Sequence, residues 1–162
     1  MIPVKIEIAD ASEIRIVLTL INELLAELGE EGDEFLGIDR EKLERDIRRD
    51  LASSEAWGRF IPLLAKDEDG TPLGVLTLSE TFAIYAGGAY GVIDEMYVRP
   101  AYRCRGVGTR LVEEAMTIAR RRRWFRVDVT GPEGQDEAPA VDFYEKLGFE
   151  FTGKKLRRLV RS

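Results

Sequence analysis

The chain contains no histidine and only one cysteine, Cys104, among its 162 residues. The absence of histidine excludes Ser-His-Asp chemistry, Cys-His nucleophiles and histidine metal sites together. A single cysteine excludes an intrachain disulfide and a cysteine cluster for zinc. Carboxylates, tyrosines, lysines and water are therefore left for proton transfer, and we expect no metal in the chemistry.

Long apolar runs are also missing, because no stretch approaches the roughly 20 residues that a membrane-spanning helix needs. The N-terminal residues 1–5 begin a strand pattern and not a signal peptide, so we expect a cytoplasmic protein without a membrane partner. The net charge of -6 disfavours nucleic acid as a partner and suits a cationic ligand. The basic run 120–123 is expected at a helix end, where cations complement the helix dipole.

The size of 18.3 kDa and the 44% of hydrophobic residues fit one globular domain, residues 1–162. Two-residue alternation predicts strands, and stripes of period 3.6 predict helices. The strands are expected at 4–8, 59–66, 72–82, 90–98 and 125–129, with a last strand containing Leu156, Leu159 and Val160. The helices are expected over about 10–28, 39–51, 109–123 and 139–147.

This pattern predicts an α+β fold of order β-α-α-β-β-β-α-β-α-β. Three central strands are expected to be antiparallel, and a helical crossover makes the fifth strand parallel to the fourth, in a mixed sheet with flanking helices. Asp10 with Glu13 predicts a capping box, and Pro62 is expected at a sheet edge or a bulge. The acidic stretch 30–37 either lines an entrance for an amine or is only solvated.

The stretch 90–110 reads as a strand, a basic glycine loop and a helix. The loop glycines Gly106 and Gly108 allow a tight turn, and the helix that follows offers unsatisfied NH groups and a partial positive charge. Such a concavity binds phosphate. Arg103, Arg105 and Arg110 place cations around it, which suits a diphosphate.

Two common phosphate motifs do not fit this loop. A P-loop requires a lysine after its last glycine, and a dinucleotide fingerprint requires a third glycine where Leu111 stands. The pattern Arg-x-x-Gly-x-Gly after a strand that ends in Met96-Tyr97-Val98 instead resembles the acetyl-CoA-binding motif of the GNAT superfamily of N-acyltransferases. The block 140–149, with Phe143-Tyr144 and Gly148-Phe149, resembles the second signature of that superfamily.

The resemblance covers about residues 90–151 and implies a single GNAT-like domain that moves an acetyl group from acetyl-CoA to a primary amine, by direct attack on the thioester. It implies that the fourth and fifth strands splay apart around the pantetheine arm. The residues that it assigns to CoA are Met96, Tyr97, Val98, Arg103, Cys104, Arg105, Gly106, Val107, Gly108 and Thr109.

Tyr144 is the general acid that the resemblance implies for the departing CoA thiolate. It also lies on the apolar face of its helix, so spacing alone favours a core tyrosine. Asp94 and Glu95 are the candidates for taking a proton from the ammonium group or holding its charge, with surface salt bridges as the alternative. Adjacent strand residues face opposite ways, and Asp94 is favoured because it would share a face with Met96 and Val98.

The chain departs from the resemblance at Glu137, where the family usually has an asparagine that contacts the CoA arm. That departure supports an alternative, a non-catalytic acyl-CoA-binding regulatory module. Cys104 is expected to contribute its backbone to the loop, so that oxidation or alkylation would block CoA. Polyamine, aminoglycoside, amino acid and protein amines all remain open as acceptors, and a homodimer is compatible with these expectations.

Overall fold

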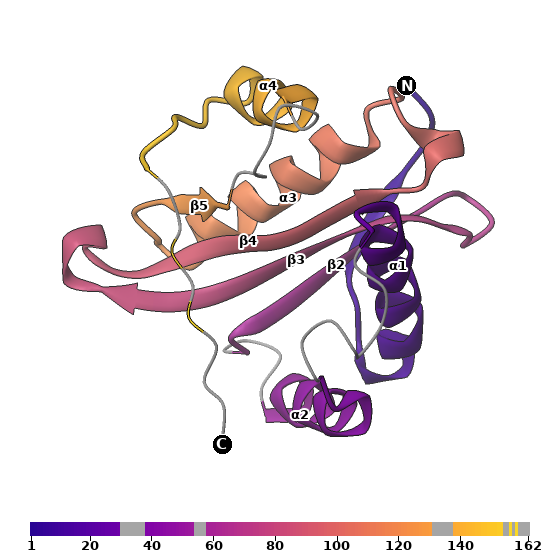
Figure 1. Cartoon of the computed structure of the whole chain (residues 1–162), viewed down its shortest axis with the longest axis horizontal. Helices are drawn as coiled ribbons and strands as arrows, with labels where there is room; N and C mark the ends of the chain where they lie inside the picture. Colours follow the sequence, from indigo (N-terminus) through magenta and orange to yellow (C-terminus); the bar gives the residue numbers. More distant parts are fainter. Residues whose placement is uncertain (30–37, 54–57, 131–137, 154–155, 157, 159–162) are drawn as a thin grey trace.

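The computed structural model describes residues 1–29, 38–53, 58–130, 138–153, 156 and 158. Five strands and four α-helices follow one another along this part of the chain in the order β-α-α-β-β-β-α-β-α (Figure 1). The strands are β1 Lys5–Ile8, β2 Phe60–Lys66, β3 Pro72–Ala83, β4 Gly88–Val98 and β5 Val127–Val129. The α-helices are α1 Ile14–Glu27, α2 Arg40–Ser53, α3 Val107–Arg121 and α4 Ala138–Lys146.

The strands form one sheet of order β1-β2-β3-β4-β5. The first four strands are antiparallel neighbours, and β5 runs parallel to β4 because α3 carries the chain across between them. The α+β architecture, the antiparallel centre and the crossover are therefore confirmed. No helix within the described ranges is long and apolar enough to cross a membrane.

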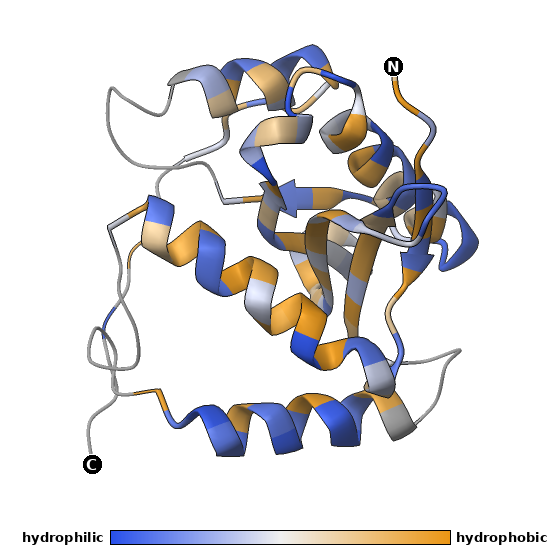
Figure 2. Ribbon diagram, turned by 90° about the vertical axis from the view of Figure 1, so that its right-hand side faces the viewer, coloured by the Kyte–Doolittle hydropathy of each residue, from blue (hydrophilic) through white to orange (hydrophobic). Residues whose placement is uncertain are grey.

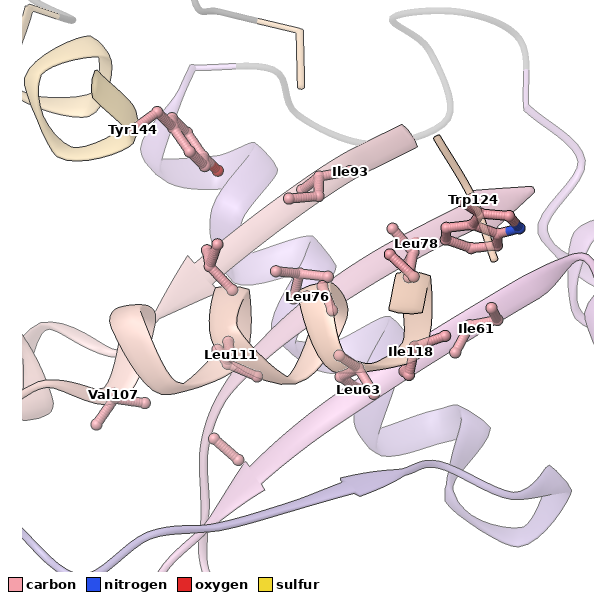
Figure 3. Close-up of a cluster of buried hydrophobic side chains, with 14 of the residues drawn as sticks. Ile61, Leu63, Leu76, Leu78, Ile93, Val107, Leu111, Ile118, Trp124 and Tyr144 are labelled. Carbon is pink, nitrogen blue, oxygen red and sulfur yellow. The ribbon is translucent and has the colours of Figure 1, made fainter. Parts of the chain in front are cut away.

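Helices cover both faces of this sheet, and each face has its own apolar core. One core lies between the sheet and α3, where Leu63, Leu76, Leu111 and Ile118 are among the buried side chains (Figure 3). The other lies between the sheet and α1 and includes Val17. Figure 2 shows α2, the lowest helix of the view, as mainly hydrophilic with apolar residues at intervals, as expected for a helix that covers a sheet from outside.

The start of α1 follows the sequence signals. The carboxylate of Asp10 accepts from the Ser12 amide at 2.8 Å, and Glu13 reaches back to the Asp10 amide at 3.4 Å, so the capping box is confirmed. A 3-10 turn, Ala11–Glu13, precedes the α-helix proper. Gly29, with a φ of 75°, follows the last turn in the left-handed conformation that glycine adopts without strain.

A β-bulge interrupts the pairing of β3 with β4. Thr77 pairs with Glu95 and Leu78 pairs with Ile93, so that Asp94 is an extra residue without a partner on β3. An extra residue shifts the two-residue alternation of the strand. Without the bulge, the side chains of β4 after Asp94 would continue the alternation that runs up to Ile93. With the bulge, each of these side chains projects from the opposite face of the sheet.

Three elements differ from the prediction. The fifth strand begins at Val127, and Phe125, which was expected inside it, is 83% exposed. Pro62 lies on β2 inside the sheet, where its missing NH does no harm because β1 ends opposite Leu63 and the Ala9 amide bonds the Pro62 carbonyl. The expected last strand lies mostly outside the described residues, and Leu156, which is described, is exposed and not in a strand.

Gly91 on β4 lies directly beneath the indole of Trp124. A Cβ at this position would lie 2.3 Å from a ring carbon of Trp124. The ring itself is fixed, because its Nε1 donates to Glu80 at 2.8 Å and the Arg122 guanidinium lies over it. The absence of a side chain at Gly91 is therefore what lets the segment after α3 return onto the sheet and begin β5.

We expect Gly91→Ala to destabilise the protein by about 1 to 3 kcal/mol, the usual cost of forcing an extra methyl group into a packed contact. The measurement is the free energy of unfolding in urea. In a Trp124→Phe background, which removes the part of the ring in contact, the same substitution should cost much less. Equal costs in the two backgrounds would show that the contact does not limit packing.

Candidate active site

The edge of β4 that faces β5 is open beyond Ile93. Pairing between the two strands stops at Ile93 and Val129, so the last residues of β4 have no parallel partner on that side among the described residues. The Arg99 amide donates to Leu73, next to β3, so the backbone groups of Met96 and Val98 point the other way, toward the open edge. The end of pairing at Ile93 and Val129 is compatible with the splay of the fourth and fifth strands that the sequence resemblance implied, and the splay stays a prediction.

Tyr97 differs from its two neighbours. By the same alternation its backbone groups face β3, and its ring, 6% exposed, belongs to the core beneath α1. The Arg103 guanidinium lies 5.6 Å from the centre of that ring. The structure therefore brings Met96 and Val98, but not Tyr97, to the open edge.

The glycine loop turns directly into α3. Gly106 precedes the helix with a φ of 84°, and the first amide that bonds within the helix is that of Arg110, to the Gly106 carbonyl at 3.0 Å. The amides of Val107, Gly108 and Thr109 therefore have no partner within the helix. The Val107 side chain is buried in the core, so only its backbone faces the loop.

The three arginines of this region have different surroundings. Arg103 donates from Nε to the Val98 carbonyl at 2.8 Å and forms an ion pair with Glu27 at 2.6 Å. Arg110 donates to the Val4 carbonyl at 3.0 Å. Arg105 is exposed, and the described residues give it no ion pair. Two of the predicted phosphate ligands thus hold parts of the protein together in this structure, and Arg105 is the most accessible of the three.

Cys104 is exposed and has a φ of 59°, which is rare for a residue with a side chain. The loop therefore turns left-handed at Cys104 and again at Gly106. Gly108 is close to α4, because a Cβ there would lie 3.4 Å from the Phe143 ring and 3.8 Å from the Met96 methyl group. A larger residue at Gly108 would crowd the space between the helix and the open edge of β4.

Tyr144 projects from α4 toward β4 (Figure 3). Its ring is 9% exposed and packs edge-on against Phe143 and Phe149, and its hydroxyl lies 3.9 Å from the Met96 sulfur. Burial raises the pKa of Tyr144 to about 12. Tyr144 is therefore a core residue, as spacing predicted. Its hydroxyl is also a protonated hydrogen-bond donor at the open edge of β4.

Asp94 and Glu95 lie on the opposite side of β4 from Met96. The Ser79 hydroxyl donates to Asp94 at 2.6 Å, and the Thr77 hydroxyl donates to Glu95. Thr77 and Ser79 alternate with Leu76 and Leu78, which belong to the core beneath α3, so both hydroxyls project toward α1 and α2.

The expectation that Asp94 shares a face with Met96 and Val98 is therefore wrong. The bulge places an extra residue at Asp94, and Ser79 and Thr77 hold the two neighbouring carboxylates on one side of the sheet. The premise that only one of them could face the acceptor fails for the same reason. Of the two, Asp94 is exposed and Glu95 is partly buried.

The environment of Glu95 makes it a weak acid. Burial, and after it the charge of Asp94, raise the pKa of Glu95 from an ordinary 4.5 to about 7. Within the described part of the chain, no lysine or arginine forms an ion pair with Glu95. A carboxylate with a pKa near neutrality is suited to accept a proton during a reaction and to release it afterwards.

Glu95 lines a cleft of about 370 Å³ on the α1 and α2 side of the sheet. Most of the exposed cleft wall is apolar and comes from the two helices and Phe60 of β2, whereas Thr77, Ser79 and Glu95 enter from β3 and β4. Asp46, Asp50 and Arg59 also line the cleft. The acidic stretch 30–37 and Glu137, both considered from sequence, lie outside the described residues.

Sequence reasoning missed Thr77, Ser79 and the cleft-lining residues of α2. The signal for the hydroxyls was present, because Thr77 and Ser79 interrupt an apolar strand at two-residue spacing and therefore share one face. No sequence signal indicated that this face is the one that meets the carboxylates. That pairing depends on the register between β3 and β4.

Residues 20–149 match the model of the Acetyltransferase (GNAT) family. A peptidyl-lysine N-acetyltransferase, YjaB, from Salmonella typhimurium is 27% identical over 129 residues, which cover 77% of this chain and 81% of the relative. An uncharacterized N-acetyltransferase, MJ1207, from Methanocaldococcus jannaschii is 38% identical, over 73% of this chain and 56% of the relative.

Solved structures show the same fold. An aminoglycoside acetyltransferase from an uncultured soil metagenomic sample superposes with a TM-score of 0.79 at 21% identity, and covers 99% of this chain and 100% of its own. A predicted acetyltransferase with acetyl-CoA from Clostridium acetobutylicum gives 0.75 at 19% identity, over 96% of each chain. At these identities the likeness describes the fold alone.

The raised pKa of Glu95 has a consequence for stability. The folded protein holds the Glu95 proton more tightly than the unfolded chain does, so the stabilisation is complete below pH 4.5 and is lost as the pH rises to about 7. Over that range wild type should lose at most about 3 kcal/mol relative to Glu95→Gln. Urea unfolding of both proteins at several pH values measures this difference, and a constant difference would contradict the raised pKa.

Proposed function

The chain belongs to the GNAT family of acetyltransferases, and from this premise we propose that it transfers the acetyl group of acetyl-CoA to a primary amine. It is an N-acyltransferase. The observation that carries the proposal is the arrangement around one strand. Tyr144 lies at the open edge of β4 beside Met96, and Glu95, the residue before Met96, faces a cleft on the other side.

Acetyl-CoA, as the donor substrate, fits the open edge and the loop. The backbone groups of Met96 and the amide of Val98 face this edge and suit an extended amide-bearing arm, which would bond to β4 as a further strand does, whereas the Val98 carbonyl already accepts from Arg103. The free amides at the start of α3, with Arg105 beside them, suit the diphosphate. The small space at Gly108 allows the arm to pass between α3 and β4.

In the proposed reaction the amine nitrogen attacks the thioester carbonyl carbon. A carbon–nitrogen bond forms, the carbon–sulfur bond breaks, and the nitrogen loses a proton while the sulfur gains one. We assign the first proton to Glu95, directly or through a water molecule, because its pKa of about 7 lets it take up a proton near neutrality. Asp94 holds the positive charge of the approaching acceptor and keeps the pKa of Glu95 high.

Tyr144 is assigned to the sulfur. With a pKa of about 12, its hydroxyl stays protonated at neutral pH and donates a hydrogen bond to the departing thiolate. Full transfer of its proton to a thiolate of pKa near 8.5 would be uphill by about 5 kcal/mol, so the hydrogen bond contributes more than the proton transfer. The final proton on sulfur then comes through solvent.

A non-catalytic acyl-CoA-binding module is the alternative. Glu95 lies beside a cleft, largely buried and without a paired cation, and a buried charge of this kind costs stability. A module that only binds acyl-CoA would not require such a carboxylate. Release of CoA thiol in the presence of an amine panel tests the proposal. Acetyl-CoA binding without any release across the panel would favour the module.

Glu95→Gln should lower kcat/KM for the amine by about 10² to 10⁴, the usual contribution of a positioned general base. In wild type, kcat/KM should rise with pH through about 7 as Glu95 loses its proton, and this limb should vanish in the variant. Asp94→Asn serves as the matched control. It removes a charge that raises the pKa of Glu95, so the limb should move to lower pH and persist.

Tyr144→Phe should remain folded, bind acetyl-CoA nearly as wild type does and lower kcat by roughly 10- to 100-fold, because only the hydrogen bond to the leaving sulfur is lost. Single-turnover acetyl transfer is the measurement, since it separates chemistry from product release. A rate within about threefold of wild type would leave Tyr144 as a packing residue only.

A further inference from the structure

The exposed wall of the cleft in front of Glu95 is largely apolar, although Asp46, Asp50, Arg59, Thr77 and Ser79 also line it. Its apolar lining residues are Val17, Leu18 and Ile21 of α1, Leu43 and Ile47 of α2, and Phe60 of β2. Leu43 is 39% exposed. An exposed apolar side chain that faces a cleft is available to bury against a ligand.

The charged groups of α2 in this cleft are already engaged. Asp46 forms ion pairs with Lys42 at 2.6 Å and with Arg49 at 2.8 Å. Asp50 accepts from the Phe60 amide at 3.0 Å. Glu95 differs, because its carboxylate accepts from the Thr77 hydroxyl and no lysine or arginine of the described residues forms an ion pair with it. The cleft thus offers one carboxylate to an ammonium group, and this carboxylate, that of Glu95, lies on the sheet.

The apolar wall and the carboxylate of Glu95 together indicate a ligand with an apolar part and a cationic part. Arg59 also lines the cleft, but no ion pair among the described residues joins it to Glu95, so this carboxylate remains available to a cation of the ligand. The apolar part of the wall gains most from methylene groups, since burial of apolar surface is favourable and roughly proportional to area. Along the six apolar side chains, a polyhydroxylated ligand would place hydroxyl groups against atoms that cannot bond them, and such burial is unfavourable.

We infer that the acceptor is a primary amine at the end of an unbranched apolar stem, as in an alkylamine or a lysine side chain, and not an amino sugar. This inference rests on the acetyl transfer proposed above. The stem lies along Leu43 and Ile47 of α2, and the amine reaches Glu95 at the sheet. An alkylamine and a peptide lysine share this chemistry and differ in what lies beyond the stem.

A series of unbranched alkylamines tests the stem. From propylamine to hexylamine the basicity of the amine is almost constant, so differences in kcat/KM report contacts of the added methylenes. We expect kcat/KM to rise about two- to fourfold per methylene, as burial of each methylene predicts. Glucosamine should react at least about tenfold more slowly than hexylamine. A flat series, or glucosamine as the better substrate, would overturn the inference.

The variant Leu43→Gln tests whether the stem of the acceptor lies along α2. The residue is partly exposed, so the variant should fold, and the steepness of the alkylamine series should decrease because one apolar wall becomes polar. Leu28→Gln is the matched control, since Leu28 is 50% exposed on the end of α1 and does not line the cleft. An unchanged series in Leu43→Gln, or an equal change in both variants, would contradict the assignment.

The outcomes separate this inference from the function on which it rests. If no amine of any class releases CoA thiol, the acetyl transfer itself is wrong and the inference falls with it. If amino sugars react and alkylamines do not, acetyl transfer stands and the apolar stem is wrong. A further arm compares hexylamine with a lysine-containing peptide, and the faster of the two identifies the source of the stem.

Discussion

The single extra residue at Asp94 is the constraint on which the site depends. Before it, the Gly91 amide donates to Arg126, next to β5, and after it the Arg99 amide donates to Leu73, next to β3. Two residues eight positions apart in an unbroken strand would point their backbone groups the same way. The bulge therefore reverses the direction of the backbone groups as well as the side chains. It turns Met96 and Val98 toward the open edge and leaves two carboxylates on the opposite face.

The same strand thereby separates two environments. On the α3 side, the Tyr144 hydroxyl and the free amides at the start of α3 border the opening between β4 and β5. On the α1 side, Glu95 meets a cleft with apolar walls. In the proposed reaction, the donor at the edge of the strand and the acceptor on its face would approach the same few atoms from different directions, as direct transfer between two substrates requires.

Much of the fold could be predicted because its signals are local. The capping box at Asp10, the period of α3 and the glycine loop each depend on residues close together in sequence, and each is found where expected. The start of β5 could not be predicted, because alternation through Phe125 has the same pattern whether or not the segment pairs. We attribute the later start of β5 to the Trp124 ring, which lies over Gly91. These two residues are 33 positions apart in the sequence.

The sequence alone determined the class of chemistry, since the absence of histidine and cysteine clusters left carboxylates and tyrosine, and the loop of two glycines indicated a diphosphate-bearing donor. It also indicated Tyr144, Asp94 and Glu95 as candidate catalytic residues. Only the tertiary structure decided which carboxylate is buried and which side it faces. The reason is physical: a one-residue bulge leaves hydrophobic periodicity almost unchanged, yet the register with Thr77 and Ser79 sets the burial of Glu95 and therefore its proton affinity.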